Sequence, residues 1–207
     1  MAESDSVYEF DNVEYVLIED NVVSKKDKKR TLMLINVFAM VIVVVLTAST
    51  FVLLYNGQTV YTFGILDLIV FTLLLMSFLP YIVIHEWLHG VAFRIFNKND
   101  KSQINFGIVW KNLMAYCIST VPVEVRAARL SLMMPVYVVC IPLYILGVAL
   151  DNVWIAFIAI FYLSGSAGDF YYLWKLRKTD KTLYMHEKNP TSDGYEIGYL
   201  LFDKKES

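Results

Sequence analysis

Residues 84–90 read Ile84-His85-Glu86-Trp87-Leu88-His89-Gly90, a His-Glu-x-x-His motif at the end of a long apolar segment. Side chains four residues apart lie on the same side of a helix, so His85 and His89 can both direct a ring nitrogen at one divalent ion. Glu86 lies about 100° around the helix from His85, close to such an ion without having to ligate it. The motif therefore predicts a zinc site with Glu86 as the base for a water molecule. The alternative is a pair of interfacial histidines that hydrogen-bond to neighbouring helices.

The composition indicates a membrane protein. Of the 207 residues, 57% are hydrophobic, 15% are aromatic and only 18% are charged, and the sequence contains long uncharged runs. These values are too apolar for an ordinary soluble domain. The net charge of −2 gives no indication of nucleic-acid binding. The expected fold class is an all-α integral membrane protein with about four transmembrane helices.

Four segments are apolar and long enough to cross ~30 Å of hydrocarbon as helices. Pro80 is expected to kink the second of them just before the histidines. Residues 1–30 are expected to form a cytoplasmic tail with at most one strand, and residues 175–207 a cytoplasmic C-terminal segment. The membrane core is expected to span residues 31–174, with helices at about 31–55, 65–96, 130–150 and 153–174.

Two polar segments carry patterns that are typical of β-hairpins. Between the second and third spans, residues 104–110 and 113–118 flank Lys111-Asn112, which predicts a small cytoplasmic β-hairpin. In the C-terminal segment, residues 182–186 and 195–201 flank a turn-rich stretch at 189–194, which predicts a second small β unit.

The distribution of charge predicts the topology. All eighteen Lys and Arg residues fall in the N-terminal segment, in the loop 94–129 and in the C-terminal segment. The positive-inside rule then places both termini in the cytoplasm and the two histidines at the cytoplasmic end of the second span. The basic cluster 25–30 is expected to anchor the chain beside anionic lipid.

A catalytic zinc site usually has three protein ligands, so the histidines need a partner from elsewhere in the chain. Asp67 lies eighteen residues before His85 on the same helix, ~27 Å away, and Asp151 in the outer turn is excluded by the same distance. His186 could reach from the C-terminal segment, although nothing fixes it there. Asp169 lies ~24 Å down the fourth span, against ~30 Å for His85 down the second, so the two depths nearly match.

Asp169 is the predicted third ligand for two further reasons. A carboxylate inside a membrane span is costly unless it is paired or bound to a metal. The preceding residues 164–168 are all small, which allows this helix to approach another closely. The alternative is that the small residues only pack helices together and that Asp169 pairs with a Lys or Arg.

The motifs His85–Gly90 and Gly168-Asp169 resemble those of the membrane zincin peptidases, a bacterial family of largely unassigned function, which is similar to the site-2 proteases. The resemblance implies a multi-pass protein of the bacterial cell membrane that binds zinc through His85, His89 and Asp169. It implies hydrolysis of a peptide bond in a membrane-anchored protein or peptide, with Glu86 taking a proton from water and returning it to the leaving amine. An edge of the hairpin 104–118 could hold an extended substrate by strand addition.

Two other functions remain open from the sequence. A non-catalytic membrane protein could use zinc for structure or bind partners, with His186 as the natural fourth ligand of a closed site. A transporter could use Asp67, Asp169 and the histidines as an ion path, although the chain has no internal duplication. The sequence does not identify the substrate or the oligomeric state.

Overall fold

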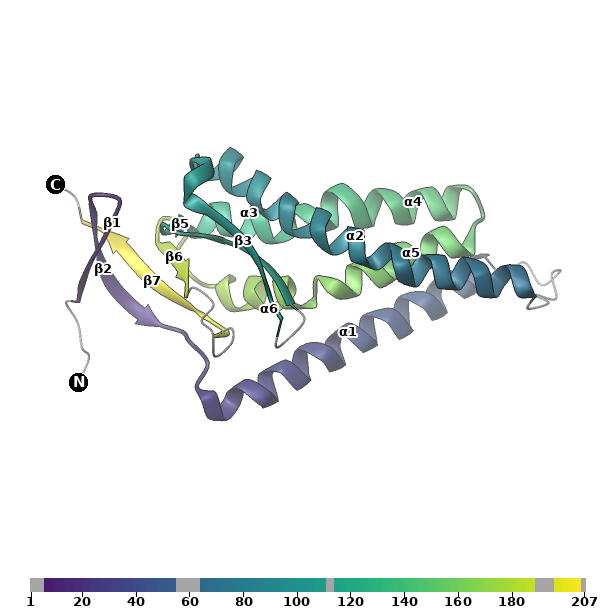
Figure 1. Ribbon diagram of the computed structural model, residues 1–207. Helices are drawn as coiled ribbons and strands as arrows, with labels where there is room; N and C mark the ends of the chain where they lie inside the picture. Colours follow the sequence, from purple (N-terminus) through teal and green to yellow (C-terminus); the bar gives the residue numbers. More distant parts are fainter. Residues whose placement is uncertain (1–5, 55–63, 111–113, 189–195, 206–207) are drawn as a thin grey trace.

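A computed structural model describes residues 6–54, 64–110, 114–188 and 196–205. The molecule is elongated, with a bundle of helices at one end and a β-sheet that includes both ends of the chain at the other (Figure 1). The predicted hairpin tip at 111–112 and the predicted turn-rich stretch at 189–194 lie outside the described residues.

Among the described residues, three helical stretches are long and apolar enough to cross a membrane: Lys25–Leu54, Leu68–Phe96 and Val125–Ala149. A bent pair of helices would make a fourth. The bent pair, α5 and α6, turns by 51° at Ser166. The helices are α1 (Lys25–Leu54), α2 (Ile65–Phe96), α3 (Val125–Pro135), the π-helix η2 (Val136–Cys140), α4 (Ile141–Ala149), α5 (Val153–Gly165) and α6 (Ala167–Leu176).

The long helices leave most of their apolar side chains on the surface. In α1, for example, Thr50 is buried within the protein, whereas valines, leucines and methionines along the helix are exposed. A helix that is apolar on all sides needs an apolar solvent around it. The helices therefore fit a membrane protein.

A five-stranded antiparallel sheet joins the two ends of the chain, so the predicted all-α fold class is wrong. In the sheet, β2 near the N-terminus pairs with β7 near the C-terminus, with Tyr15 opposite Lys204. A pairing between such distant segments leaves no local pattern in the sequence. The strand order is β1 (Val7–Phe10), β2 (Val13–Asp20), β7 (Tyr199–Lys204), β6 (Tyr184–Glu187) and β5 (Val123–Glu124).

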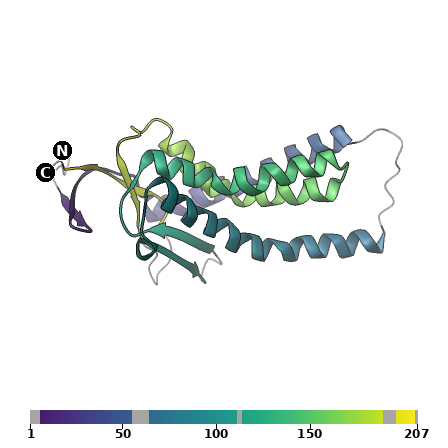
Figure 2. The ribbon, with the colours of Figure 1, turned by 90° about the horizontal axis from the view of Figure 1, so that it is seen from above.

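The β-hairpin predicted between the second and third spans is present as a separate two-stranded sheet. It follows a short 3-10 helix, η1 (Lys101–Gln103), and consists of β3 (Ile104–Val109) and β4 (Met114–Ser119). The hairpin lies along the C-terminal half of α2 (Figure 2). It is therefore next to the His-Glu-x-x-His motif.

A tight turn determines how the chain enters the five-stranded sheet. Asp11 and Asn12 join β1 to β2 with positive φ angles of 52° and 62°. Two consecutive residues with positive φ make a type I′ turn, whose twist suits a two-residue hairpin, and Asp and Asn tolerate this conformation better than most residues.

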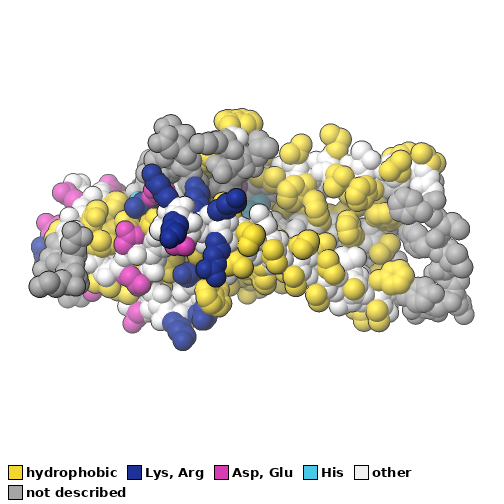
Figure 3. Space-filling model, turned by 90° about the horizontal axis from the view of Figure 1, so that it is seen from below, with side chains coloured by type: hydrophobic (Ala, Val, Ile, Leu, Met, Phe, Trp, Pro, Cys, Tyr) yellow, Lys and Arg dark blue, Asp and Glu magenta, His cyan; other side chains and the backbone are white. Residues whose placement is uncertain are grey.

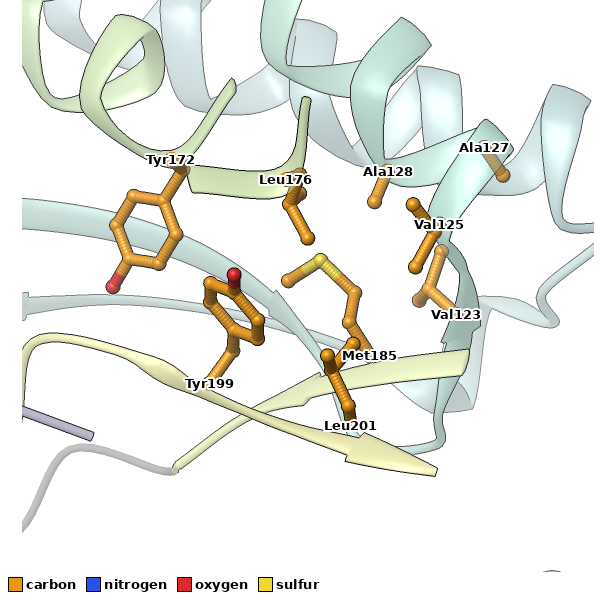
Figure 4. Close-up of a cluster of buried hydrophobic side chains, with 9 residues drawn as sticks. All are labelled: Val123, Val125, Ala127, Ala128, Tyr172, Leu176, Met185, Tyr199 and Leu201. Atoms are coloured by element: carbon orange, nitrogen blue, oxygen red, sulfur yellow. The ribbon is translucent and has the colours of Figure 1, made fainter. Parts of the chain in front are cut away.

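The main core packs the sheet against α3 and α6. Side chains from β5, β6 and β7 meet side chains from these two helices in one buried cluster (Figure 4). Its members are Val123, Val125, Ala127, Ala128, Tyr172, Leu176, Met185, Tyr199 and Leu201. Apolar burial on this scale fixes the sheet to the end of the bundle that carries the His-Glu-x-x-His motif.

Gly198 connects the sheet to α6. Its backbone N–H donates to the hydroxyl oxygen of Tyr172 at 2.9 Å, and its φ angle is +128°. A β-carbon at this position would collide with the backbone of Asn21. Only glycine combines this backbone conformation with so close an approach.

We predict that Gly198→Ala lowers the thermal stability of the purified protein, because the backbone strain alone costs about 1–3 kcal/mol. Gly168→Ala is the matched control: Gly168 lies in α6, and a β-carbon there would meet nothing within 4 Å. This change should be neutral or stabilising, since Ala is the better helix former. Equal melting temperatures for the two variants would contradict the role assigned to Gly198.

Candidate metal centre

The structure brings His85, His89 and Asp169 together. The two histidines project from one face of α2, and Asp169 lies in the first turn of α6. The two Nε2 atoms are 3.1 Å apart. Asp169 Oδ2 lies 3.2 Å from His85 Nε2, and Oδ1 lies 3.5 Å from His89 Nε2.

Asp169 reaches this position because the fourth apolar segment is bent rather than straight. The chain turns at Ser166, which is fully buried, and α6 starts at the next residue. The small residues before Asp169 do not all contribute to this helix packing. A β-carbon on Gly165 would meet Phe78 at 3.6 Å, whereas one on Gly168 would meet open space. The close approach to α2 therefore takes place at the bend and not at Gly168.

The outer nitrogens of both imidazole rings have partners. His89 Nδ1 lies 2.9 Å from the backbone carbonyl oxygen of Ser131, so the nitrogen must carry the proton and donate it. His85 Nδ1 lies 3.1 Å from the hydroxyl of Tyr81. In a neutral imidazole that donates through Nδ1, Nε2 carries the lone pair. This arrangement turns the Nε2 lone pairs toward each other and toward Asp169.

This donor set fits zinc. A lone pair on each imidazole and the oxygens of a carboxylate face one another, and Asp169 Oδ2 is buried without a hydrogen-bond partner. A single proton could form a hydrogen bond between two of these atoms. The remaining lone pairs would still face one another with no proton between them. Tetrahedral zinc with ligands at 2.0–2.2 Å places neighbouring donors about 3.3–3.6 Å apart. The observed separations of 3.1, 3.2 and 3.5 Å lie close to that range.

Glu86 lies beside this cluster and outside it. Its carboxylate lies near the backbone of Cys117 in β4 and near both histidines. The hairpin is held close to α2 at this point, because a β-carbon on Gly90 would overlap the ring of Phe106 and lie 3.3 Å from Cys117 Sγ. The glycine after His89 thus allows the hairpin to contact the helix next to Glu86.

The other candidate ligands lie elsewhere. His186 is buried in β6 next to Phe10, and burial lowers its pKa below the usual value. Asp151 lies in the turn after α4, at the end of the bundle far from the sheet, and the side chain of Asp67 is outside the described residues. In the part of the chain that the structure describes, His85, His89 and Asp169 form the group that could hold a metal ion.

The two cysteines are both unpaired and buried. Burial, followed by the nearby negative charges of Glu86 and Glu187, raises the pKa of the Cys117 thiol. A thiol in this state is a packing group and not a thiolate ligand. Cys140, in the π-helix η2, lies 3.4 Å from the Tyr81 hydroxyl.

Sequence comparison identifies the class of protein. The family described as "Putative zincin peptidase" matches residues 78–184, more than half of the chain, and this range includes both histidines and Asp169. The chain belongs to this family, and the assignment supports a zinc metallopeptidase. Neither the curated proteins nor the solved structures contain a significant match to the chain.

We predict that the purified protein contains about one zinc per chain, since three protein ligands are the usual set for a catalytic zinc. His85→Ala, His89→Ala and Asp169→Asn should each lose the metal, because two remaining ligands bind it too weakly. His186→Gln is the control and should retain it. The measurement is zinc content by elemental analysis, and loss of zinc from His186→Gln would contradict the three-ligand site.

Proposed function

We propose that this protein is a membrane-embedded zinc metallopeptidase that cleaves a peptide bond of a membrane-associated protein or peptide near the cytoplasmic face. The convergence of His85, His89 and Asp169, whose facing atoms lie 3.1 to 3.5 Å apart, is the observation that carries the proposal. The family assignment supports the chemistry independently, because a zincin uses a metal to hydrolyse an amide.

The residues around the metal have distinct tasks. When bound, zinc would polarise a peptide carbonyl and lower the pKa of a water molecule to about 7. Glu86 is the general base, because its carboxylate lies near both histidines and near the backbone of Cys117. Glu86 takes the proton from the attacking water and then delivers it to the leaving amine.

The arrangement of charge supports the proposed orientation in the membrane. The five-stranded sheet contains strands from all three segments that hold the Lys and Arg residues, so these segments share one end of the bundle. On the face shown in Figure 3, basic side chains gather between the sheet and the apolar helices. Exposed cations at the start of α1 and the end of α6 include Lys25, Lys26, Lys29, Arg30, Lys175, Arg177 and Lys178.

This basic band suits anionic headgroups at the cytoplasmic surface of a membrane. Trp174 is exposed in the same region, and the guanidinium of Arg177 lies 4.2 Å from the centre of its ring. Tryptophan and arginine are typical of the boundary between hydrocarbon and headgroups. The metal centre would then lie near the cytoplasmic end of α2, on the hydrocarbon side of this boundary.

The edge of β4 next to Glu86 is the proposed place for the substrate. The backbone of Cys117 in β4 lies near the Glu86 carboxylate, which places this part of the strand beside the proposed base. Backbone groups alternate in direction along an antiparallel strand, so the N–H and carbonyl of Ala115 leave β4 on the same side as those of Cys117. An extended peptide paired with this edge would pass the metal centre, and strand pairing also supplies the extended conformation that peptide cleavage requires.

We predict that Glu86→Gln keeps its zinc and loses peptide hydrolysis by about 10²–10⁴-fold, the usual contribution of a general base. The measurement is comparative membrane proteomics of cells with the intact chain or this variant, searching for fragments that depend on the intact chain. Glu187→Gln is the control: it removes the charge of another half-buried carboxylate, in β6, and should leave hydrolysis unchanged. Fragments that persist at full level in Glu86→Gln would refute the proposed mechanism and favour a non-catalytic zinc protein.

We predict that Ala115→Pro reduces cleavage of a polypeptide substrate while zinc binding stays unchanged. Proline removes the outward N–H of β4 but no hydrogen bond between β3 and β4. Ala115→Val is the control, because it adds a side chain and keeps the N–H. If both variants cleave at the rate of the intact protein, the substrate does not pair with this edge.

A further inference from the structure

The metal histidines must both be held in one tautomer. An imidazole ligates through Nε2 only when that nitrogen carries no proton, and the tautomer is set by the hydrogen bond that Nδ1 makes. In each ring the Nδ1 proton therefore needs a dedicated acceptor. The acceptors here are a backbone carbonyl for His89 and a phenol for His85.

A helical carbonyl is normally already engaged. Inside an α-helix, the carbonyl of residue i accepts from the N–H of residue i+4. Ser131 lies inside α3, and the residue four positions later is Pro135, which has no N–H to donate. The carbonyl of Ser131 thus has no partner within its own helix at the position where His89 Nδ1 approaches to 2.9 Å.

The chain after Pro135 does not restore that bond. The N–H of Val136 goes to the carbonyl of Met133, and the helix then widens into the π-helix η2, where the N–H of Ile141 reaches the carbonyl of Val136. Ser131 is 1% exposed, so no solvent replaces the missing donor. Its hydroxyl also binds to α2 and donates to the carbonyl of His89 at 3.3 Å.

The hydroxyl of Tyr81 serves His85 in the same way. It is buried, lies 3.1 Å from His85 Nδ1 and lies 3.4 Å from Cys140 Sγ in the π-helix. If Nδ1–H donates to the phenol oxygen, the phenol proton goes on to the sulfur. Tyr162 stacks on Tyr81 with ring centres 3.9 Å apart and planes at 1°, which fixes the position of the ring.

We propose that Pro135 and Tyr81 are positioning residues of the metal centre. Pro135 leaves the Ser131 carbonyl free to accept from His89, Tyr81 accepts from His85, and together they hold both Nε2 lone pairs toward the ion. The inference rests on the zinc site of the proposed function and is independent of peptide hydrolysis.

The test compares zinc dissociation constants of the full-length protein in detergent, measured by competition with a chelator. Pro135→Ala restores an N–H that competes with His89 for the carbonyl, and Tyr81→Phe deletes the acceptor for His85. Each should weaken zinc binding by about 10–100-fold, as the loss of such outer partners does. The matched controls are Pro142→Ala, in the same apolar span, and Tyr144→Phe, whose hydroxyl lies 2.9 Å from Thr50 Oγ1. Both should bind zinc like the unaltered chain.

Two further readouts separate positioning from a general effect on folding. Alanine suits a helix better than proline, so zinc-free Pro135→Ala should melt at the same temperature as the unaltered chain or higher, while its zinc affinity falls. The visible spectrum of the Co²⁺-loaded protein should change in Pro135→Ala and Tyr81→Phe and stay constant in both controls, because only the first pair alters the orientation of a ligand.

Each outcome decides the matter. Unchanged zinc affinity in Pro135→Ala and Tyr81→Phe would overturn the proposal, and so would an equal loss in the controls. Absence of zinc binding by the unaltered chain would overturn it together with the proposed function. If the affinities fall as expected and no peptide is cleaved, the positioning roles stand and the peptidase proposal falls.

Discussion

The placement of three electron-pair donors in the interior of a helical bundle is the constraint on which the structure depends. His85 and His89 come from α2 and Asp169 comes from α6, and their facing atoms lie 3.1 to 3.5 Å apart. A buried polar group without a partner costs about 1–3 kcal/mol, and a buried carboxylate costs more. Without a cation between the donors, the contact of α2 with α6 at this point would raise the free energy of the folded state. A metal ion between the donors would remove this cost, so the packing supports a metal site at His85, His89 and Asp169.

The five-stranded sheet maintains that geometry from a distance. β5 leads directly into α3, which carries the carbonyl that orients His89, and β7 contacts α6 through Gly198 and Tyr172. Arg129 of α3 adds a direct bond between these helices, since its guanidinium donates to the carbonyls of Leu176 and Thr179 at the end of α6. The sheet and Arg129 thus fix α3 and α6 to each other. Segments at both ends of the chain, which contribute no ligand, determine where the ligands stand.

The sequence predicts the parts of the site that follow from local geometry. Helical spacing places His85 and His89 on one face, and counting residues along two spans gives Asp169 nearly the depth of His85. The structure brings all three together. The hairpin of β3 and β4 was also predictable, because it is formed by neighbouring segments with turn residues between them.

Long-range features were not predictable in this way. The pairing of β2 with β7 has no local signature, which explains why an all-α fold was expected. The bend at Ser166 and the acceptors for the two histidines were missed as well. One signal for them was available: Pro135 lies four residues after Ser131, so the sequence already marks one carbonyl in that span as free. Which donor would approach this carbonyl depends on the packing of α3 against α2.

The number and arrangement of the donors bear on the choice among the three functions that the sequence left open. A structural zinc site is usually closed by four protein ligands, and the natural fourth, His186, lies in β6 against Phe10. Among the described residues the group has three members, which leaves one position for water. A transporter would distribute its ionisable groups along a path through the membrane. Here His85, His89 and Asp169 converge on one point, and Glu86 lies next to them outside the group. A group of three potential ligands, with the carboxylate of Glu86 next to it, therefore supports the proposed hydrolase over both alternatives.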